Sequence, residues 1–303
     1  TAAKHANGED WWFFRMRSNT NHYLKFLLSS EGINLIDTFS IGPPLIDPHD
    51  GTGQAVFSPD GSKYITFDNS NFLNIYDFDR STGDLSNHRQ VFLDYPTNYL
   101  FCGVSISPNS RFVYITQPTH LSQVDLHTED LQESLTLIDV YDGFVAFAPT
   151  NFFYQTMGPD CKIYICSSNT VRYLHTIHRP NEKGKACNFR QHDVYLPNPT
   201  SSLPNFPHFR IDEDEICDPT LTSVFGIPIE VVKPEITIYP NPTADILRFS
   251  APVDSYRVYN LSGAKMLDGS NVEEVNIKEL PTGLYMVSYT IDGVSASQKV
   301  SKI

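Results

Sequence analysis

Residues 57–66 read Phe-Ser-Pro-Asp-Gly-Ser-Lys-Tyr-Ile-Thr, and variants of this stretch return twice further along the chain. Residues 106–116 read Ile-Ser-Pro-Asn-Ser-Arg-Phe-Val-Tyr-Ile-Thr, and residues 157–166 read Met-Gly-Pro-Asp-Cys-Lys-Ile-Tyr-Ile-Cys. The shared prolines lie 49 and then 51 residues apart, and a degenerate copy at residues 5–12 lies about one period upstream. A repeat of this length is typical of β-propeller blades rather than of helical repeats.

Each copy predicts a hairpin in which an apolar strand, a Pro-Asp/Asn-Gly/Ser turn and a β-branched or aromatic strand follow one another. After the copy at residues 57–66, residues 72–78 and 88–93 offer two further strands, joined by a turn at residues 81–84. Four antiparallel strands per period make one blade, and blades must stack because a single blade cannot cover both of its faces. We therefore expect an all-β fold with four visible blades, at residues 1–50, 51–98, 99–148 and 149–211.

Four blades is the low end of the usual range, and Thr1 opens the chain without an initiator methionine or a secretory leader. These two features lead us to expect a larger ring whose upstream blades lie outside this chain, so that the propeller at residues 1–211 is incomplete at its N-terminus. Residues 203–211 are expected to form one more innermost strand, which would close the ring by completing an N-terminal blade.

The repeat pattern ends at an acidic run, residues 212–215, and Pro228 and Pro234 keep the following stretch extended. We expect a linker at residues 212–233 and a second domain at residues 234–303. Seven short alternating segments there predict an immunoglobulin-like β-sandwich; they are residues 236–239, 245–249, 255–260, 264–268, 272–277, 284–291 and 294–301.

Four motifs follow one another in this second domain: Tyr-Pro-Asn-Pro at residues 239–242, Val-Tyr-Asn-Leu-Ser-Gly at 258–263, Leu-Pro-Thr-Gly-Leu-Tyr at 280–285 and Lys-Val-Ser-Lys-Ile at 299–303. In this order at the C-terminus they resemble the type A C-terminal sorting domain of the type IX secretion system. The first two hundred residues are similar, more loosely, to propeller passengers that are often fused to such domains. The signal positions that the resemblance implies are Pro240, Asn241, Pro242, Leu261, Gly263, Pro281, Gly283, Tyr285, Lys299 and Lys302.

The resemblance also implies a route and partners. A cleaved leader would direct the chain to the periplasm, and the type IX translocon and an outer-membrane shuttle would carry it across the outer membrane. A sortase would usually remove the C-terminal domain, leaving the passenger at the cell surface or in the medium. The alternative interpretation of the individual residues is structural, because prolines and glycines serve turns and lysines protect edge strands from aggregation.

Charge and hydropathy exclude other classes of partner. The net charge of −13 would repel a nucleic-acid backbone, and no apolar run approaches the ~18 residues of a membrane-spanning helix. No glycine-rich loop that cradles phosphate precedes a helix, and no cofactor is predicted.

The five cysteines raise two possibilities, a metal site and a disulfide. Cys161 and Cys166, followed by His175 and His178, suggest zinc, but residues five or three apart on a strand point to opposite faces, so no metal site is predicted. A structural disulfide is expected instead among Cys166, Cys187 and Cys217, with the pairing left open.

No set of residues in the sequence converges on a known catalytic pattern. We therefore predict a secreted or cell-surface propeller that acts by binding or assembly, with an unknown surface glycan or protein as its ligand at the loops around the ring axis. One alternative is an extracellular hydrolase or lyase with active groups in the central channel, because the propeller fold alone does not determine function. Another is a structural subunit of an extracellular assembly, in which the sorting domain would be retained.

Overall fold

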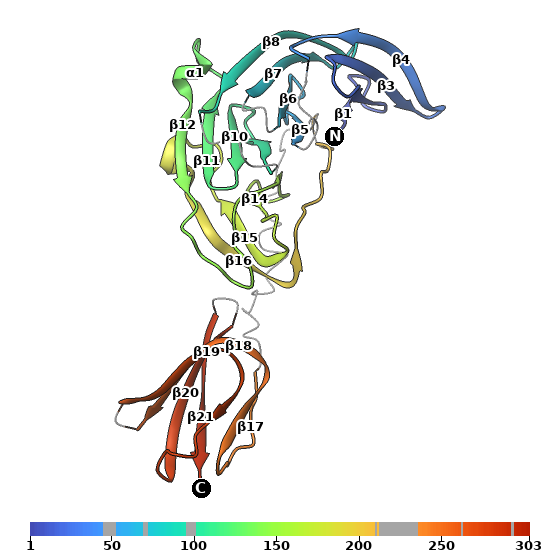
Figure 1. Ribbon diagram of the computed structural model, residues 1–303. Coiled ribbons are helices and arrows are strands. Elements are labelled where there is room, and N and C mark those ends of the chain that lie inside the picture. Colours follow the sequence, from blue (N-terminus) through green and yellow to red (C-terminus); the bar gives the residue numbers. More distant parts are fainter. Residues whose placement is uncertain are drawn as a thin grey trace. The chain divides into compact units, whose positions relative to one another are not determined.

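The computed structural model describes residues 1–44, 53–68, 72–94, 101–209, 211, 236–261, 263–291 and 294–303 (Figure 1). The expected linker at residues 212–233, including Cys217, lies outside the described residues. The chain divides into two compact units, one formed by Thr1–Phe144 and Pro149–Gly226 and the other by Val145–Ala148 and Ile227–Ile303.

The described part of the N-terminal unit forms four sheets of four antiparallel strands each, which we name the first to the fourth blade. Within each blade, neighbouring strands follow one another along the chain, as expected for propeller blades. The first blade contains β1 (Ala3–Lys4), β2 (Trp11–Met16), β3 (His22–Ser29) and β4 (Gly32–Ser40); the second contains β5 (Gln54–Phe57), β6 (Lys63–Phe67), β7 (Phe72–Asp79) and β8 (Asp84–Phe92); the third contains β9 (Gly103–Ile106), β10 (Phe112–Gln117), β11 (His120–Asp125) and β12 (Thr136–Val140); the fourth contains β13 (Gln155–Met157), β14 (Ile163–Ile165), β15 (Val171–Ile177) and β16 (Phe189–Thr200). Two short helices, α1 (Leu131–Ser134) and η1 (Gly184–Cys187), lie between strands.

The repeated Pro-Asp-Gly motif forms the turn between the first two strands of a blade. The N–H of Gly61 donates to the carbonyl of Ser58 (2.9 Å), and the Asp60 carboxylate accepts from both the backbone and the hydroxyl of Ser62 (2.9 Å each). Burial opposes the charge on Asp60, but these hydrogen bonds to the ionised form outweigh it and hold the pKa of Asp60 below its usual value. The predicted hairpins and the all-β propeller are confirmed.

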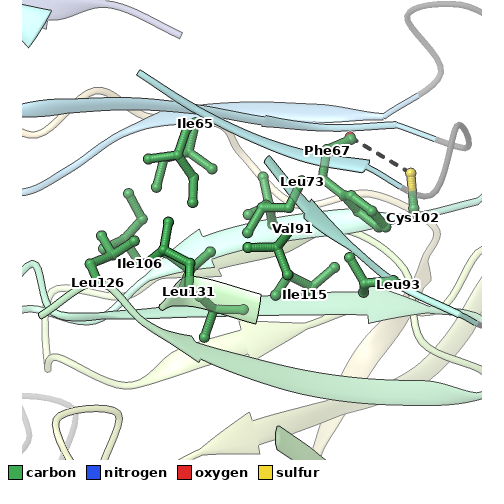
Figure 2. Packing of buried hydrophobic residues seen from close by; sticks show 14 residues of the cluster. Ile65, Phe67, Leu73, Val91, Leu93, Cys102, Ile106, Ile115, Leu126 and Leu131 are labelled. Atoms are coloured by element: carbon green, nitrogen blue, oxygen red, sulfur yellow. Dashed lines mark hydrogen bonds between the residues drawn. The ribbon is translucent and has the colours of Figure 1, made fainter. Parts of the chain in front are cut away.

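Blades stack through apolar side chains that alternate along their strands. Between the second and third blades, Ile65, Leu73 and Ile75 of one sheet pack with Val113 and Ile115 of the other, and each of these side chains is at most 1% exposed. Figure 2 shows this layer, with side chains of both blades meeting between the ribbons. Similar clusters join the first blade to the second and the third to the fourth. Burial of these side chains is the main stabilising term for each pair of blades.

The innermost strands of three blades meet at Gln54. Its Oε1 accepts from the backbone N–H groups of Val104 and Gln155 (3.1 Å each), and its Nε2 donates to the carbonyl of Gln155 (2.6 Å). The backbones come so close here that a Cβ on Gly103 would lie 2.4 Å from the carbonyl oxygen of Phe153. One glutamine side chain thus connects β5, β9 and β13.

The prediction of a strand at residues 203–211 is wrong. The described part of this segment forms no strand, although it runs from the end of β16 back towards the first blade (Figure 1). Leu203 packs against the fourth blade, and Phe209 contacts Trp11 of the first blade edge-on, with ring centroids 5.4 Å apart. Pro204 and Pro207 lack the N–H groups that a strand ladder requires, and the first blade already has four strands of its own.

The C-terminal unit is a β-sandwich, and its described residues form five strands, not the seven predicted. Its strands are β17 (Ile238–Tyr239), β18 (Ile246–Asn260), β19 (Lys265–Asn276), β20 (Gly283–Ile291) and β21 (Val294–Lys302). Segments predicted as separate strands are joined, because β18 and β19 continue through a shift in register between Arg248 and Val253 instead of breaking into loops. The core is built by alternate side chains of these strands, such as Tyr285, Val287 and Tyr289 of β20.

Candidate functional site

Two regions concentrate chemistry-bearing residues, and each lies within one unit. The first is one end of the C-terminal unit, where the four sequence motifs meet. The second is a cavity in the N-terminal unit.

Asn241 joins the first motif to the last. Its Nδ2 donates to the carbonyl of Lys299, and its Oδ1 accepts from the N–H of Ser301, both at 2.9 Å. Beside it, the N–H of Thr243 donates to the carbonyl of Ser301 (2.9 Å), and the N–H of Ile303 donates to the carbonyl of Thr243 (2.9 Å). The start of the domain therefore binds the edge of β21, the final strand.

The third motif lies at the same end. Gly283 is paired with Lys302 and Tyr285 with Val300 across β20 and β21, and the Tyr285 hydroxyl donates to the carbonyl of Pro281 (2.7 Å). Tyr285 is 5% exposed and Lys302 is 8% exposed. Both residues therefore stabilise the fold at this end of the sandwich and do not form an exposed binding surface.

The second motif completes the cluster. Asn260, the last residue of β18, is paired with Tyr285, so the turn that follows it lies at the same end of the sheet. Gly263 takes a φ of +80° in this turn, where glycine meets no steric penalty, and its N–H donates to the carbonyl of Asn260 (3.0 Å). Leu261 is 77% exposed. Motifs spread over more than sixty residues thus converge at one end of the sandwich, which the sequence order alone did not reveal.

The cavity in the N-terminal unit has a volume of about 580 Å³. Its walls come from β2 and β3 of the first blade, from β5 and β6 of the second, and from segments next to the fourth. The aromatic residues that line it are Phe14, Tyr23, Tyr64, Phe67 and Tyr154, and the polar residues include Arg15, Ser18, Gln54, Thr66, Asp68, Ser202 and Asn205.

The cavity combines neutral tyrosine hydroxyls with the side chains of one acidic residue, Asp68, and one basic residue, Arg15. Burial raises the pKa values of Tyr23 and Tyr64, so both hydroxyls stay protonated at neutral pH. Asp68 is 6% exposed, whereas Arg15 is exposed. Both polar atoms of Gln54 are already used in the contacts between blades, so Gln54 contributes to the wall and not to recognition.

Sequence reasoning did not identify the cavity as a site. Tyr64 lies in the quoted repeat and residues 203–211 were singled out, but only as structural features. Its other lining residues come from strands far apart in the chain, and no local motif marks them.

The expected disulfide among Cys166, Cys187 and Cys217 is wrong, because each possible pair includes Cys166 or Cys187, and both of these are buried free thiols. Cys166 packs with Phe153 and Leu174, whereas Cys187 packs in the layer between the third and fourth blades, so the two sulfurs lie in different clusters. Burial raises the pKa of Cys166 to about 12 and also raises that of Cys187, so neither thiol is activated. Cys161, which had been weighed only as a metal ligand, is disulfide-bonded.

The histidines near Cys161 serve the fold. His175 is fully buried, and His178 lies 2.6 Å from the Asp193 carboxylate through its Nε2. Within the described ranges, no group of three histidine, cysteine or acidic side chains has the arrangement of a metal site. No helix among the described residues is long and apolar enough to cross a membrane.

Comparisons with solved structures give distant matches. A putative 6-phosphogluconolactonase from Bacteroides fragilis matches with a TM-score of 0.45 and 13% identity, over 66% of this chain and 55% of that chain. A periplasmic gluconolactonase from Pseudomonas aeruginosa matches with a TM-score of 0.42 and 14% identity, over 66% and 54%. A putative 6-phosphogluconolactonase from Bacteroides uniformis matches with a TM-score of 0.44 and 11% identity, over 99% and 84%. The chain spans about half the length of the first two structures.

No curated protein matches the chain. The family model described as "Secretion system C-terminal sorting domain" matches residues 237–302, which hold the first three motifs and all but the last residue of the fourth. The C-terminal unit is therefore a type IX secretion sorting domain, and the chain is a cargo of that system with a β-propeller passenger, exported through the periplasm to the cell surface or the extracellular space.

Proposed function

We propose that the propeller is a binding protein that acts without catalysis at the cell surface or outside the cell, and that its 580 Å³ cavity holds a sugar. The observation that carries the proposal is the make-up of this cavity, in which aromatic rings lie beside hydroxyl, carboxylate and guanidinium groups. Sugars have this dual character, since their C–H faces pack on aromatic rings while their hydroxyl groups need donors and acceptors.

The cavity is large enough for this class of ligand. Pockets for small molecules have volumes of roughly 300–1,000 Å³, with apolar walls and a few placed polar groups. Asp68 can accept hydrogen bonds from ligand hydroxyls, the neutral Tyr64 hydroxyl can donate, and Arg15 offers a charge at the rim. The position of Tyr154 beside Phe153, with ring centroids 3.8 Å apart, gives its ring a fixed orientation.

Replacing Tyr154 with alanine is expected to weaken sugar binding about tenfold, because an aromatic contact of about 1 kcal/mol or more is lost. Isothermal titration with a panel of mono- and oligosaccharides would measure this. The matched control is Tyr195→Ala, because Tyr195 is a half-buried tyrosine of β16 outside the cavity. Asp68→Asn is expected to change the preference among sugars while leaving the cavity shape intact.

Three results would contradict the proposal. One is an equal loss of affinity in the Tyr154 and Tyr195 variants, and another is the absence of binding across the panel. The third is turnover of lactones or glycosides in the same assay, which would favour the hydrolase alternative.

We also propose transient partners for the C-terminal unit. After the translocon has moved the chain across the outer membrane, the outer-membrane shuttle would receive the unit and the sortase would remove it. The convergence of the four motifs at one end of the sandwich supports a single recognition event there.

A further inference from the structure

One face of the first blade is largely apolar, and the described residues cover it only in part. We call it the outer face; its apolar side chains alternate along three neighbouring strands and are Trp11 and Phe13 of β2, Leu24, Phe26 and Leu28 of β3, and Ile33 and Leu35 of β4. Lys4, Arg15 and Thr38 share this face. Leu28 is 40% exposed, Leu35 is 55% exposed and Ile33 is 63% exposed. A sheet with a free face usually alternates between apolar and polar residues, so seven apolar residues on this face indicate that a partner covers it.

The opposite face of the same blade is already occupied. Trp12, which is 4% exposed, and Tyr23, which is 3% exposed, pack on the second blade, and the indole N–H of Trp12 donates to the carbonyl of Arg80 (2.9 Å). The first blade is therefore apolar on both faces. The second and third blades share this property, and each of them has a neighbour on both sides.

A ring pair on the outer face has a counterpart at a known contact between blades. Phe13 and Phe26 are paired across β2 and β3, with stacked rings whose centroids lie 5.0 Å apart. Across β6 and β7, the corresponding strands of the second blade, Tyr64 and Tyr76 are also paired, with centroids 6.0 Å apart, at the position that Trp11 and Leu28 hold in the first blade. The first blade covers that tyrosine pair, leaving the two residues only 7% and 2% exposed. The outer face is thus the equivalent of the face that the second blade presents to the first, and both faces carry a paired set of aromatic rings.

We propose that a further four-stranded blade, supplied by the same polypeptide ahead of Thr1, packs on the outer face. The argument is continuity with the three established contacts between blades, all of which join apolar faces of sheets that are consecutive in the chain. A second copy fits less well, because each copy carries a net charge of −13 and the two would repel one another. Phe209 contacts Trp11 at the start of β2, with ring centroids 5.4 Å apart.

Hydroxyl-radical footprinting with mass spectrometry tests this proposal. The 303-residue chain is compared with the same chain extended by its native upstream coding sequence. We expect the modification rates of Phe13, Phe26 and Ile33 to fall severalfold in the extended protein. The rates of Phe72 and Phe92, a partly exposed ring pair of the second blade, should stay unchanged and serve as the internal control. Equal rates at the outer face in the two proteins would overturn the proposal.

A pair of neighbouring substitutions on β4 provides a second test. Leu35→Lys places a charge on the outer face, whereas Asn34→Lys places it on an exposed position of the opposite face. In the extended protein, Leu35→Lys is expected to lower the melting temperature by about 5 °C or more, and Asn34→Lys should have little effect. In the 303-residue chain, the two variants should melt alike. Equal melting temperatures of the two variants in the extended protein, or dimerisation of the 303-residue chain that Leu35→Lys abolishes, would overturn the proposal.

Discussion

Acidification from about pH 7 to about pH 4 is expected to cost the propeller unit about 3 kcal/mol of stability through His175 alone. His175 is fully buried in the fourth blade, where its ring meets Phe152 edge-on (centroids 4.9 Å apart) and its Nδ1 accepts from the N–H of His192 (3.3 Å). Burial, together with the neighbouring His192 ring, lowers the pKa of His175 to about 3, even though the backbone of Thr150 acts in the opposite direction.

The direction of the effect follows from the pH at which the unfolded state and the folded state each bind the proton. In the unfolded chain the imidazole titrates near pH 6.5, whereas in the folded unit it stays neutral down to about pH 3. Between these two values only the unfolded state gains the proton, so stability is complete above pH 6.5 and falls by about 1.4 kcal/mol for each pH unit below it. Burial also lowers the pKa values of His192 and His208, which adds to the loss.

Urea unfolding followed by tryptophan fluorescence measures the effect on the propeller alone, because both tryptophans, Trp11 and Trp12, lie in that unit. His175→Asn keeps an acceptor for the His192 N–H but removes the titrating group, and it should flatten the slope between pH 6 and pH 4. The control is His127→Asn at an exposed position, which should keep the slope of the unmodified chain. A slope that His175→Asn leaves unchanged would contradict this account.

Replacing Asn241 with leucine is expected to have the largest effect of any single substitution on export. The change removes both hydrogen bonds to β21, from Nδ2 to the carbonyl of Lys299 and from the N–H of Ser301 to Oδ1. The sorting domain should lose about 2 kcal/mol of stability, since each such bond contributes about 1 kcal/mol. The end of the sandwich where the motifs meet would then lose its fixed shape, and the amount of protein at the cell surface should fall strongly.

Asn241→Asp provides the graded comparison for this prediction. It keeps an acceptor for the Ser301 N–H and loses only the donor to Lys299, so its surface level should lie between those of the leucine variant and the unmodified chain. Surface labelling of intact cells, with periplasmic extracts probed in parallel, gives the ratio. Full delivery of the leucine variant would show that the hydrogen bonds of Asn241 do not contribute to the signal.

The sequence predicted the features whose physical causes are local. The turns at Pro59, Pro108 and Pro159 recur because a Pro-Asp/Asn-Gly/Ser turn needs only its own residues, and the blades follow from the four strands that each period offers. Sorting motifs were recognisable for a similar reason, because their order along the chain is itself the signal.

The features that failed or were missed depend on contacts between distant residues. Cys166 and Cys187 are close enough in the chain to suggest a disulfide, but the packing of the fourth blade sends them into different clusters. Tyr64, Tyr154 and Asn205 are far apart in the chain but line the same cavity, and no local sequence pattern predicts this arrangement. Similarly, the joining of seven predicted strands into five depends on β18 and β19 both continuing through a shift in register, which their local sequences do not signal.

The central claim is that the C-terminal unit alone addresses the chain for export. Its most direct test grafts residues 234–303 onto an unrelated folded reporter with a periplasmic leader, in a bacterium that has the type IX system, and measures surface delivery beside that of the chain truncated after residue 233. We predict that the graft reaches the cell surface or the medium and that the truncated chain stays in the periplasm. Retention of the grafted reporter in the periplasm, or full delivery of the truncated chain, would contradict the account.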